Sequence, residues 1–482
     1  MVDAGEQDHK PGMLRRVRRR WLDRMTPVQL LAVCLGAAVL IGSGLLMLPF
    51  AHTQPLRYVD ALFTATSAVC VTGLIAVDTG TAYTGFGQAV ILCLIQLGGL
   101  GVMATSTFVL LALGKRASMR NLLLVRGEYT TSARGSALKI LLVVGFFTVL
   151  AEAAGALLLG HRFSAESASS DLGKAVDSAG GAAWCGVFHS VSAFCNAGFS
   201  LFPKNMIAWR SDLTVTLVMP LLIIVGGIGF PAMNDVLSKI HWRLRGVRTA
   251  LSLHAKIVFT VTGLLLVLGT VAFFVLESPN FAGAPFWERL GISWFQSATT
   301  RTAGFNTLDF GAATEPTILV TIWLMFIGGA PGGTAGGIKV TTFAVLLLIV
   351  VSRLRGHERL EIGKRTIPEF TMMRALVVAL LCLALVFVAT FALLLTDGST
   401  VQPPEKHGSF LSLLFEVVSA FGTVGLSMIS TAATGALTWM GKLVIIAVMF
   451  AGRVGPLALA QMVLALDRPL RYRYPEEQLL VG

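Results

Sequence analysis

Four copies of one pattern organise this chain: FTATSAVCVTGL (Phe63–Leu74), FHSVSAFCNAGF (Phe188–Phe199), WFQSATTRTAGF (Trp294–Phe305) and FEVVSAFGTVGL (Phe415–Leu426). Each copy opens with an aromatic residue and places a glycine ten positions later, followed by Leu or Phe. Three of the copies carry a serine six positions before that glycine. The copies recur about every 120 residues, and one shared register indicates a repeated structural unit rather than four unrelated packing motifs of small residues.

Each copy lies between two longer apolar stretches. About 20 apolar residues cross the hydrocarbon core of a bilayer. Only 13% of the 482 residues are charged, which is too few to cover the surface of a soluble domain. The sequence therefore predicts an all-α polytopic membrane protein with eight transmembrane helices, over residues 27–50, 85–113, 138–160, 212–237, 255–277, 316–352, 371–396 and 437–466.

The positive charges indicate how the chain is oriented. An excess of Lys and Arg marks the cytoplasmic side of a membrane protein. We therefore expect a plasma-membrane protein with both termini in the cytoplasm. The net charge of +12 follows from this topology and from contact with lipid headgroups, and it does not require a nucleic-acid partner. Most of the 38 Lys and Arg residues lie in the segments expected on that side, 1–26, 114–139, 238–256, 353–374 and 467–482.

The repeated segments are too short and too polar at one end to cross a bilayer. We interpret each as a re-entrant pore loop, so that one repeat is a helix, a pore loop and a second helix. Non-helical backbone at membrane depth must be buried in protein or line a water-filled cavity, and four such loops predict one central pore. The expected parts are a basic N-terminus (1–26), four repeats (27–113, 138–237, 255–352 and 371–466) and a C-terminal tail (467–482).

The three residues that end at each shared glycine suit a dehydrated monovalent cation. Backbone carbonyls replace the hydration shell of potassium in TVGYG filters, and one triplet here reads TVG. Glycine tolerates positive φ, which lets successive carbonyls point the same way. No triplet contains an acidic residue, which would favour divalent ions. The predicted potassium filter, which binds the ion by backbone carbonyls, consists of Val71, Thr72, Gly73, Asn196, Ala197, Gly198, Thr302, Ala303, Gly304, Thr423, Val424 and Gly425.

These segments resemble the four pore loops of the Trk/Ktr/HKT superfamily of potassium transporters, over about residues 27–466. The runs GGAPGGTAGGIKVTT and GRVGPL add to the resemblance. In that family a filter glycine in every repeat goes with potassium, and a serine in the first repeat goes with sodium. Glycine at all four positions therefore implies potassium as the transported ion. The first repeat begins by residue 27, which makes the chain more similar to the Ktr-type membrane subunit.

The resemblance also implies partners. It implies a homodimer, with a separate cytosolic ring of RCK-type nucleotide-binding subunits docked on the basic faces. We expect the nucleotide-binding domain on another chain, because no βαβ pattern follows residue 466. No organic cofactor is expected on this chain.

A glycine-rich run interrupts the second span of repeat 3. Six glycines and a proline cannot sustain a straight helix. One interpretation is a packing kink. The other is a flexible loop beneath the filter that moves aside on gating, and the resemblance favours it because Trk/Ktr proteins have an intramembrane gating loop here. The predicted gating loop consists of Gly328, Gly329, Ala330, Pro331, Gly332, Gly333, Thr334, Ala335, Gly336, Gly337, Ile338 and Lys339.

Three charged residues stand out in or beside apolar stretches. Arg453 interrupts the last span at a cost of at least about 2.5 kcal/mol. It belongs either to a structural ion pair or at the pore, and the resemblance places it at the pore as a barrier to permeation. Arg301 is expected to brace the filter from behind. Glu152 is a lone acid with no evident partner in the sequence.

Two transport functions fit these repeats and pore loops. The first is potassium uptake through a selective, gated, channel-like pore. The alternative is a secondary transporter that couples potassium to sodium or protons. Inverted repeats would favour the transporter, whereas these four repeats run in one direction and favour the pore. We expect no enzyme activity, because no HExxH or GxSxG motif lies on a span.

Overall fold

The computed structural model describes residues 27–118, 133–165, 179–246, 250–281, 283–357, 360–362, 365–399, 408–428 and 437–455. The predicted basic N-terminus (1–26), the end of the predicted last repeat (456–466) and the predicted tail (467–482) lie outside the described residues.

The described chain is built from four units of the same order. Each unit opens with a long apolar helix: α2 (Pro27–Leu46), α6 (Ala133–Ala165), α10 (Leu253–Leu276) and α14 (Glu369–Asp397). A short helix follows that ends at the repeated triplet: α3 (Tyr58–Cys70), α7 (Ala179–Phe194), α11 (Phe286–Thr299) and α15 (Ser409–Gly422). Each unit then has a closing helix: α5 (Gly85–Ser118), α8 (Leu213–Ile228), α12 (Glu315–Phe326) and α16 (Trp439–Val454).

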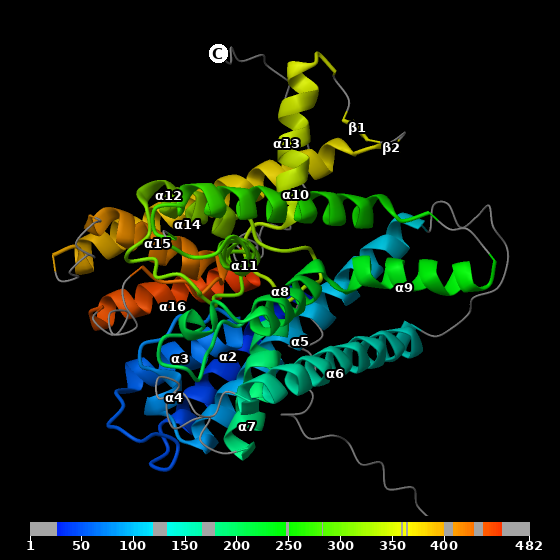
Figure 1. The fold of residues 1–482 in the computed structure, drawn as a ribbon. Helices are drawn as coiled ribbons and strands as arrows, with labels where there is room; N and C mark the ends of the chain where they lie inside the picture. The colour runs from blue at the N-terminus through cyan, green and yellow to red at the C-terminus, as the bar shows by residue number, and fades with distance from the viewer. Residues whose placement is uncertain are drawn as a thin grey trace, which may run out of the picture.

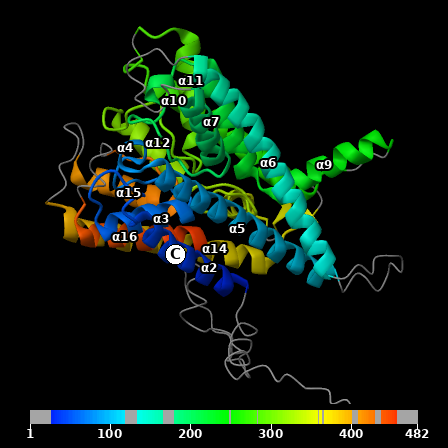
Figure 2. The ribbon, with the colours of Figure 1, turned by 90° about the horizontal axis from the view of Figure 1, so that it is seen from below.

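The units pack in a closed cycle. The closing helix of each unit contacts the short helix of the next: α5 on α7, α8 on α11, α12 on α15, and α16 back on α3. The first unit (blue) and the last (red) consequently lie side by side in Figures 1 and 2. This order places the four short helices and their triplets around one axis.

The remaining elements lie between or beyond the units. α4 (Thr79–Ala82) and the 3₁₀ helix η2 (Ile207–Trp209) lie in the connections that follow the first two triplets. A two-stranded hairpin, β1 (Glu361–Ile362) and β2 (Arg365–Thr366), precedes α14. In Figure 1, α13 (Val340–Leu354) rises away from the bundle and α9 (Phe230–Leu244) extends from its side.

Two predicted spans are not continuous helices. Where the sequence predicts one span over 212–237, α8 and α9 meet at 97°. The break is at Gly229, which has φ of 84° and is followed by a proline in the first turn of α9. Where it predicts a span over 316–352, α12 and α13 are separated by the glycine-rich run. Glycine and proline disfavour a regular helix at both places.

Among the described residues, four helices are long and apolar enough to cross a membrane, or five if the bent pair counts as one span. The four are Gln29–Leu46, Leu142–Ala165, Leu253–Leu276 and Glu369–Asp397, which belong to the opening helices of the units. Shorter apolar helices include Gly85–Gly101, Glu315–Phe326 and Val340–Leu354. The chain is thus a multi-pass helical membrane protein, and the count of eight crossings stays a prediction.

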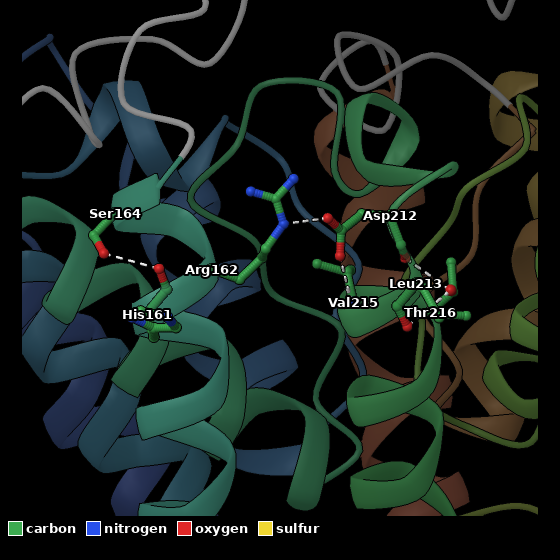
Figure 3. A network of polar contacts seen from close by, with 7 residues as sticks. All are labelled: His161, Arg162, Ser164, Asp212, Leu213, Val215 and Thr216. Carbon is green, nitrogen blue, oxygen red and sulfur yellow. Dashed lines mark hydrogen bonds and ion pairs between the residues drawn. The ribbon is translucent and has the colours of Figure 1, made fainter.

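One end of repeat 2 is held by a polar network that Figure 3 shows in detail. Asp212 caps α8 by accepting from the backbone N–H of Val215 at 2.9 Å. Arg162, on the last turn of α6, points at Asp212 and donates to its carboxylate. The Arg162 guanidinium also lies 5.7 Å from the ring centroid of Trp209. These contacts join the last turn of the opening helix α6 to the first turn of the closing helix α8.

Candidate functional site

The four triplets have the same unusual backbone. Their first residues adopt positive φ: Val71 (55°), Asn196 (59°), Thr302 (74°) and Thr423 (50°). Their glycines do so as well: Gly73 (88°), Gly198 (70°), Gly304 (81°) and Gly425 (94°). Positive φ is uncommon outside glycine and marks positions that the surrounding structure imposes. Its recurrence at the same two places in four units identifies one local structure made four times.

The triplet glycines meet in a ring. A Cβ atom added at any of them would collide with the backbone oxygen of the residue before the glycine in the next repeat. The pairs are Gly73 with Ala197, Gly198 with Ala303, Gly304 with Val424, and Gly425 with Thr72. Because the last pair returns to the first repeat, the triplets surround a single axis in chain order. Side chains are excluded there, so backbone forms the lining.

The repeated serine supports the triplet from its own short helix. In repeats 1 and 4, the hydroxyls of Ser67 and Ser419 each accept from the triplet glycine N–H at 3.0 Å. In repeat 2, Ser192 instead donates to the Phe199 carbonyl at 2.9 Å. Repeat 3 has Ala298 at this position and cannot make either bond. The serine seen in three copies of the pattern is therefore a local brace with two different partners.

Asn196, the first residue of the second triplet, connects repeat 2 to the glycine-rich loop. In the orientation that satisfies both ends of its amide, the nitrogen donates to the carbonyls of Ala193 (3.0 Å) and Ile223 (3.2 Å). The amide oxygen then accepts from the Thr334 hydroxyl at 3.3 Å. The side chain thus points away from the ring. By contrast, the hydroxyls of Thr302 and Thr423 are buried and have no hydrogen-bond partner within the described structure.

The predicted gating loop lies against the ring, next to the end of α7 and the first residue of the fourth triplet. Thr334 donates from its backbone N–H to the Gly226 carbonyl (3.1 Å), and its hydroxyl lies 3.3 Å from the carbonyl of Phe194, the last residue of α7. A Cβ atom at Gly336 would collide with the Thr423 side chain. The loop is further tied to the α8–α9 corner, because Ala330 N–H donates to the Gly227 carbonyl at 2.9 Å. The loop therefore touches the triplets or short helices of repeats 2 and 4.

The two predicted functional arginines both bind the backbone of this region. Arg453 is buried and donates to the carbonyls of Thr334 in the loop and Gly98 in α5, the latter at 2.8 Å. Among the described residues its partners are carbonyl oxygens, and no carboxylate pairs with it there. Arg301 donates to Thr262 in α10 (3.3 Å) and to Gly328, the first loop residue (3.2 Å). Arg301 thus holds the loop as well as the region behind the ring.

Two buried polar contacts were missed or left unexplained by sequence reasoning. Glu152 accepts from the Gln96 side chain at 3.1 Å, so the partner absent from its sequence neighbourhood comes from another unit. Lys442 and Asp60 form a buried ion pair with Nζ–Oδ1 at 2.6 Å. Gln96 and Lys442 each lie inside an apolar stretch of the sequence. A polar residue there needs a partner in the membrane, so these two residues could have indicated both contacts.

Comparisons with known proteins agree with this architecture. The TrkH family of cation transport proteins matches residues 11–466. The chain is 40% identical to Ktr system potassium uptake protein B of Bacillus subtilis, over 96% of this chain and 98% of that protein. It is 35% identical to the potassium/sodium uptake protein NtpJ of Enterococcus hirae, over 98% and 99% of the two chains.

A solved structure has the same fold. It is the crystal structure of the potassium transporter TrkH from Vibrio parahaemolyticus, with a TM-score of 0.69 over 92% of this chain and 86% of that chain, at 17% identity. The match of the family over nearly the whole sequence confirms the resemblance carried by the four repeated segments. The chain belongs to the TrkH family of cation transport proteins.

Proposed function

We propose that this chain takes up potassium across the plasma membrane through a selective, gated, channel-like pore, as the ion-translocating subunit of a Ktr/Trk-type system. The observation that carries the proposal is the closed ring in which each triplet glycine packs against a carbonyl of the next repeat. A ring of carbonyls can replace the hydration shell of a cation without a fixed charge that would trap it. The names of the relatives support potassium as that cation.

The filter of this proposal consists of the twelve triplet residues. Backbone carbonyls bind the ion, and the buried hydroxyls of Thr302 and Thr423 are further oxygens available to it. Glycine occupies the shared position in all four repeats, which the family resemblance associates with potassium rather than sodium. No acidic residue stands in the ring, which argues against a divalent cation.

The gate of this proposal is the loop from Gly328 to Lys339. Its contacts with Phe194 and with the Thr423 side chain support a position directly under the filter. Arg453 donates to the loop at Thr334, and its charge then lies beside the path of the ion. We infer that, in the closed state, the loop obstructs the pore. Arg453 then both holds the loop and repels cations.

The assembly extends the same proposal. We infer a homodimer, both termini in the cytoplasm, and regulation by a separate RCK-type nucleotide-binding ring. The relatives named as Ktr system components support membership of a multi-component system. This chain requires no organic cofactor in the proposal, because the transported ion is the ligand.

The alternative is a secondary transporter that couples potassium to sodium or protons. The name of the Enterococcus relative, a potassium/sodium uptake protein, favours keeping it. Against it, the four units pack in one cyclic order, with each closing helix on the next short helix. Coupled transport would be supported by potassium accumulation against its gradient when a sodium or proton gradient is imposed.

The deciding experiment is cation flux into proteoliposomes that contain this chain alone. We expect uptake of potassium and rubidium to exceed that of sodium and lithium, and potassium to run only down its electrochemical gradient. Equal flux of all four ions would reject the filter. Uphill potassium movement that depends on an imposed sodium or proton gradient would replace the pore with the coupled transporter.

A further inference from the structure

Buried side chains on three of the short helices reach across to the segment that follows the triplet. The side chains are His189, Gln296 and Glu416, each fully buried. His189 and Glu416 stand nine positions before the glycine of their repeat, and Gln296 stands eight before. All three bind groups two to four positions after that glycine. The three residue types differ, so the repeated pattern in the sequence does not reveal them.

In repeat 2 the link is made by a histidine. His189 Nε2 accepts from the backbone N–H of Leu201 at 3.3 Å and is 3.1 Å from the Ser200 hydroxyl. His189 Nδ1 is 2.7 Å from the Cys185 carbonyl, one turn earlier on α7. The ring is therefore a neutral tautomer with its proton on Nδ1, because Nε2 must be an acceptor for Leu201. It also stacks on Phe202, with ring centroids 4.7 Å apart.

In repeat 4 the equivalent link is made by a carboxylate. Glu416 Oε1 accepts from the backbone N–H of Met428 at 3.2 Å and from the Ser427 hydroxyl. Ser427 and Met428 occupy the same positions after Gly425 as Ser200 and Leu201 do after Gly198. A histidine nitrogen and a glutamate oxygen thus accept from equivalent donors in two repeats.

In repeat 3 an amide makes the equivalent contact from one position closer to the glycine. With its amide oriented to satisfy the donors around it, the oxygen of Gln296 accepts from the backbone N–H groups of Thr307 (2.8 Å) and Leu308 (2.9 Å). It also accepts from the Thr307 hydroxyl at 3.2 Å. Repeat 1 differs, because Thr64 at the equivalent position is bonded by the Tyr83 hydroxyl at 3.1 Å.

We infer that His189, Gln296 and Glu416 are positioning residues of the filter, which hold the outer ends of the triplets of repeats 2, 3 and 4 at a set distance from their short helices. The inference rests on the proposed function, since it assigns these contacts to the ion-selective ring. The backbone that follows a triplet sets the direction of the last triplet carbonyl. A fixed buried acceptor behind it therefore keeps that carbonyl directed at the axis. We name these three residues the outer clamps.

The repeats differ in how many side chains support the triplet. The supports are the repeated serine, which binds the triplet itself, and the outer clamp, which binds the segment after it. Repeat 4 has both, because Ser419 binds Gly425 and Glu416 binds Met428. Repeat 3 has alanine at the serine position. Among the described contacts, the side-chain support of its triplet comes from Gln296. Loss of a clamp should therefore let the last triplet carbonyl change direction without blocking the pore. Its signature is weaker ion discrimination with flux retained.

The test compares two substitutions at one clamp. Glu416→Gln keeps an acceptor oxygen and nearly the same volume, whereas Glu416→Leu removes every acceptor. Each purified protein is measured in proteoliposomes for its potassium-to-sodium flux ratio, its rubidium uptake per folded protein and its melting temperature in detergent. The control is Thr390→Val on α14, a buried hydroxyl that bonds the carbonyl of Val386 one turn earlier.

We expect Glu416→Leu to lower the potassium-to-sodium ratio about fivefold or more, the scale of one lost buried hydrogen bond. Glu416→Gln should stay within about twofold of wild type, as should Thr390→Val, because both preserve the clamp geometry. If Glu416→Leu does not fold, Ser427→Ala removes one donor and should still lower the ratio.

Three results would overturn the inference. One is an unchanged ratio in folded Glu416→Leu, another is an unchanged ratio in Ser427→Ala, and the third is an equal loss in the Gln and Leu variants. A wild-type protein that does not distinguish potassium from sodium is a different result. It would reject the filter itself, before any clamp variant is compared.

Discussion

At Gly73 the ring leaves no room for a side chain. The residue has φ of 88°, and an added Cβ atom would collide with the Ala197 oxygen of the next repeat. We predict that Gly73→Ser lowers the potassium-to-sodium permeability ratio, because the side chain displaces a carbonyl and adds a competing hydroxyl. Permeability is measured in proteoliposomes with the two cations in competition.

Gly283 provides a matched control for backbone strain. It has φ of 89°, but an added Cβ atom there would meet nothing within 4 Å. Gly283→Ser therefore carries the same conformational penalty without the collision, and should leave the ratio at its wild-type value. If Gly73→Ser also keeps the wild-type ratio, the assignment of repeat 1 to the filter is wrong.

Residues near the axis could be predicted from the sequence better than the residues that hold them. The triplet glycines stand out because four copies share one register, and the structure brings all four together. The partner of Glu152 is Gln96, which lies in the preceding unit. The amide of Asn196 reaches Thr334 in the following unit. Pairing between units depends on how they pack, and the local spacing of residues carries no information about it.

At the scale of elements, the glycine-rich loop is an ordered structure with many backbone bonds. Gly328 N–H donates to Ile338 at 2.9 Å, which closes the loop at its base. We predict that removal of residues 330–333 raises flux and weakens regulation, because the shortened loop no longer covers the pore. The measurement is rubidium uptake per folded protein, with and without the regulatory subunit. Unchanged uptake by folded protein would leave the loop as a packing kink.

In the proposed mechanism, Arg453 holds that loop through its bond to Thr334 and repels cations in the pore. At an effective dielectric of about 20, two unit charges 4 Å apart repel by roughly 4 kcal/mol. Water in the pore lowers this value, yet about 1.4 kcal/mol already changes a rate tenfold. We predict that Arg453→Ala raises maximal rubidium uptake and leaves the potassium-to-sodium ratio intact, because the ring is untouched.

A second substitution separates charge from hydrogen bonding at this site. Arg453→Lys keeps the positive charge but cannot make both bonds, to Thr334 and to Gly98, in the same geometry. Slow uptake in the lysine variant would assign the effect to charge, and fast uptake would assign it to release of the loop. Lower thermal stability without faster uptake in Arg453→Ala would exclude both roles and leave a purely structural arginine.

The elements themselves were predictable in order but not in continuity. Apolar length locates the opening helices near their observed bounds, whereas the predicted spans 212–237 and 316–352 run well past the ends of α8 and α12. The sharp corner between α8 and α9 was missed, although Gly229 and the proline two positions later are visible in the sequence. Both residue types are tolerated within membrane helices when neighbouring groups satisfy the backbone. Whether they bend a helix depends on those neighbours, here the loop carbonyl of Gly332 that accepts from Phe230.

At the scale of the whole molecule, the chain closes on itself. Repeats in one direction predict a pore, but they do not predict which helix of one unit contacts the next. The structure supplies that rule, since the closing helix of each unit lies on the short helix of the following one. The contact of α16 with α3 joins the last unit to the first, and α16 also contacts α2.

An ion pair spans this closing contact. Lys442, in the first turn of α16, lies 2.6 Å from Asp60 in the first turn of α3, and both residues are buried. Removal of one partner leaves an uncompensated buried charge, which costs about 3–5 kcal/mol, whereas removal of both leaves none. We predict that Lys442→Met and Asp60→Leu each lower the melting temperature in detergent strongly. The double variant should be more stable than the sum of the two single losses allows.

The more exposed pair of Arg210 and Glu288 is the internal control for this prediction. Its N–O distance is 3.5 Å and the arginine side chain is 56% exposed, so the same double-mutant cycle should give a coupling of about 1 kcal/mol or less. The cycle at Lys442 and Asp60 should exceed it clearly, because desolvated charges interact strongly and neighbouring residues are not additive. Single Lys442 variants should also lose potassium selectivity, since α3 ends at the first triplet and moves with its contact. Additive losses at Lys442 and Asp60, with selectivity retained, would show that packing of α16 against α3 closes the ring without the charges.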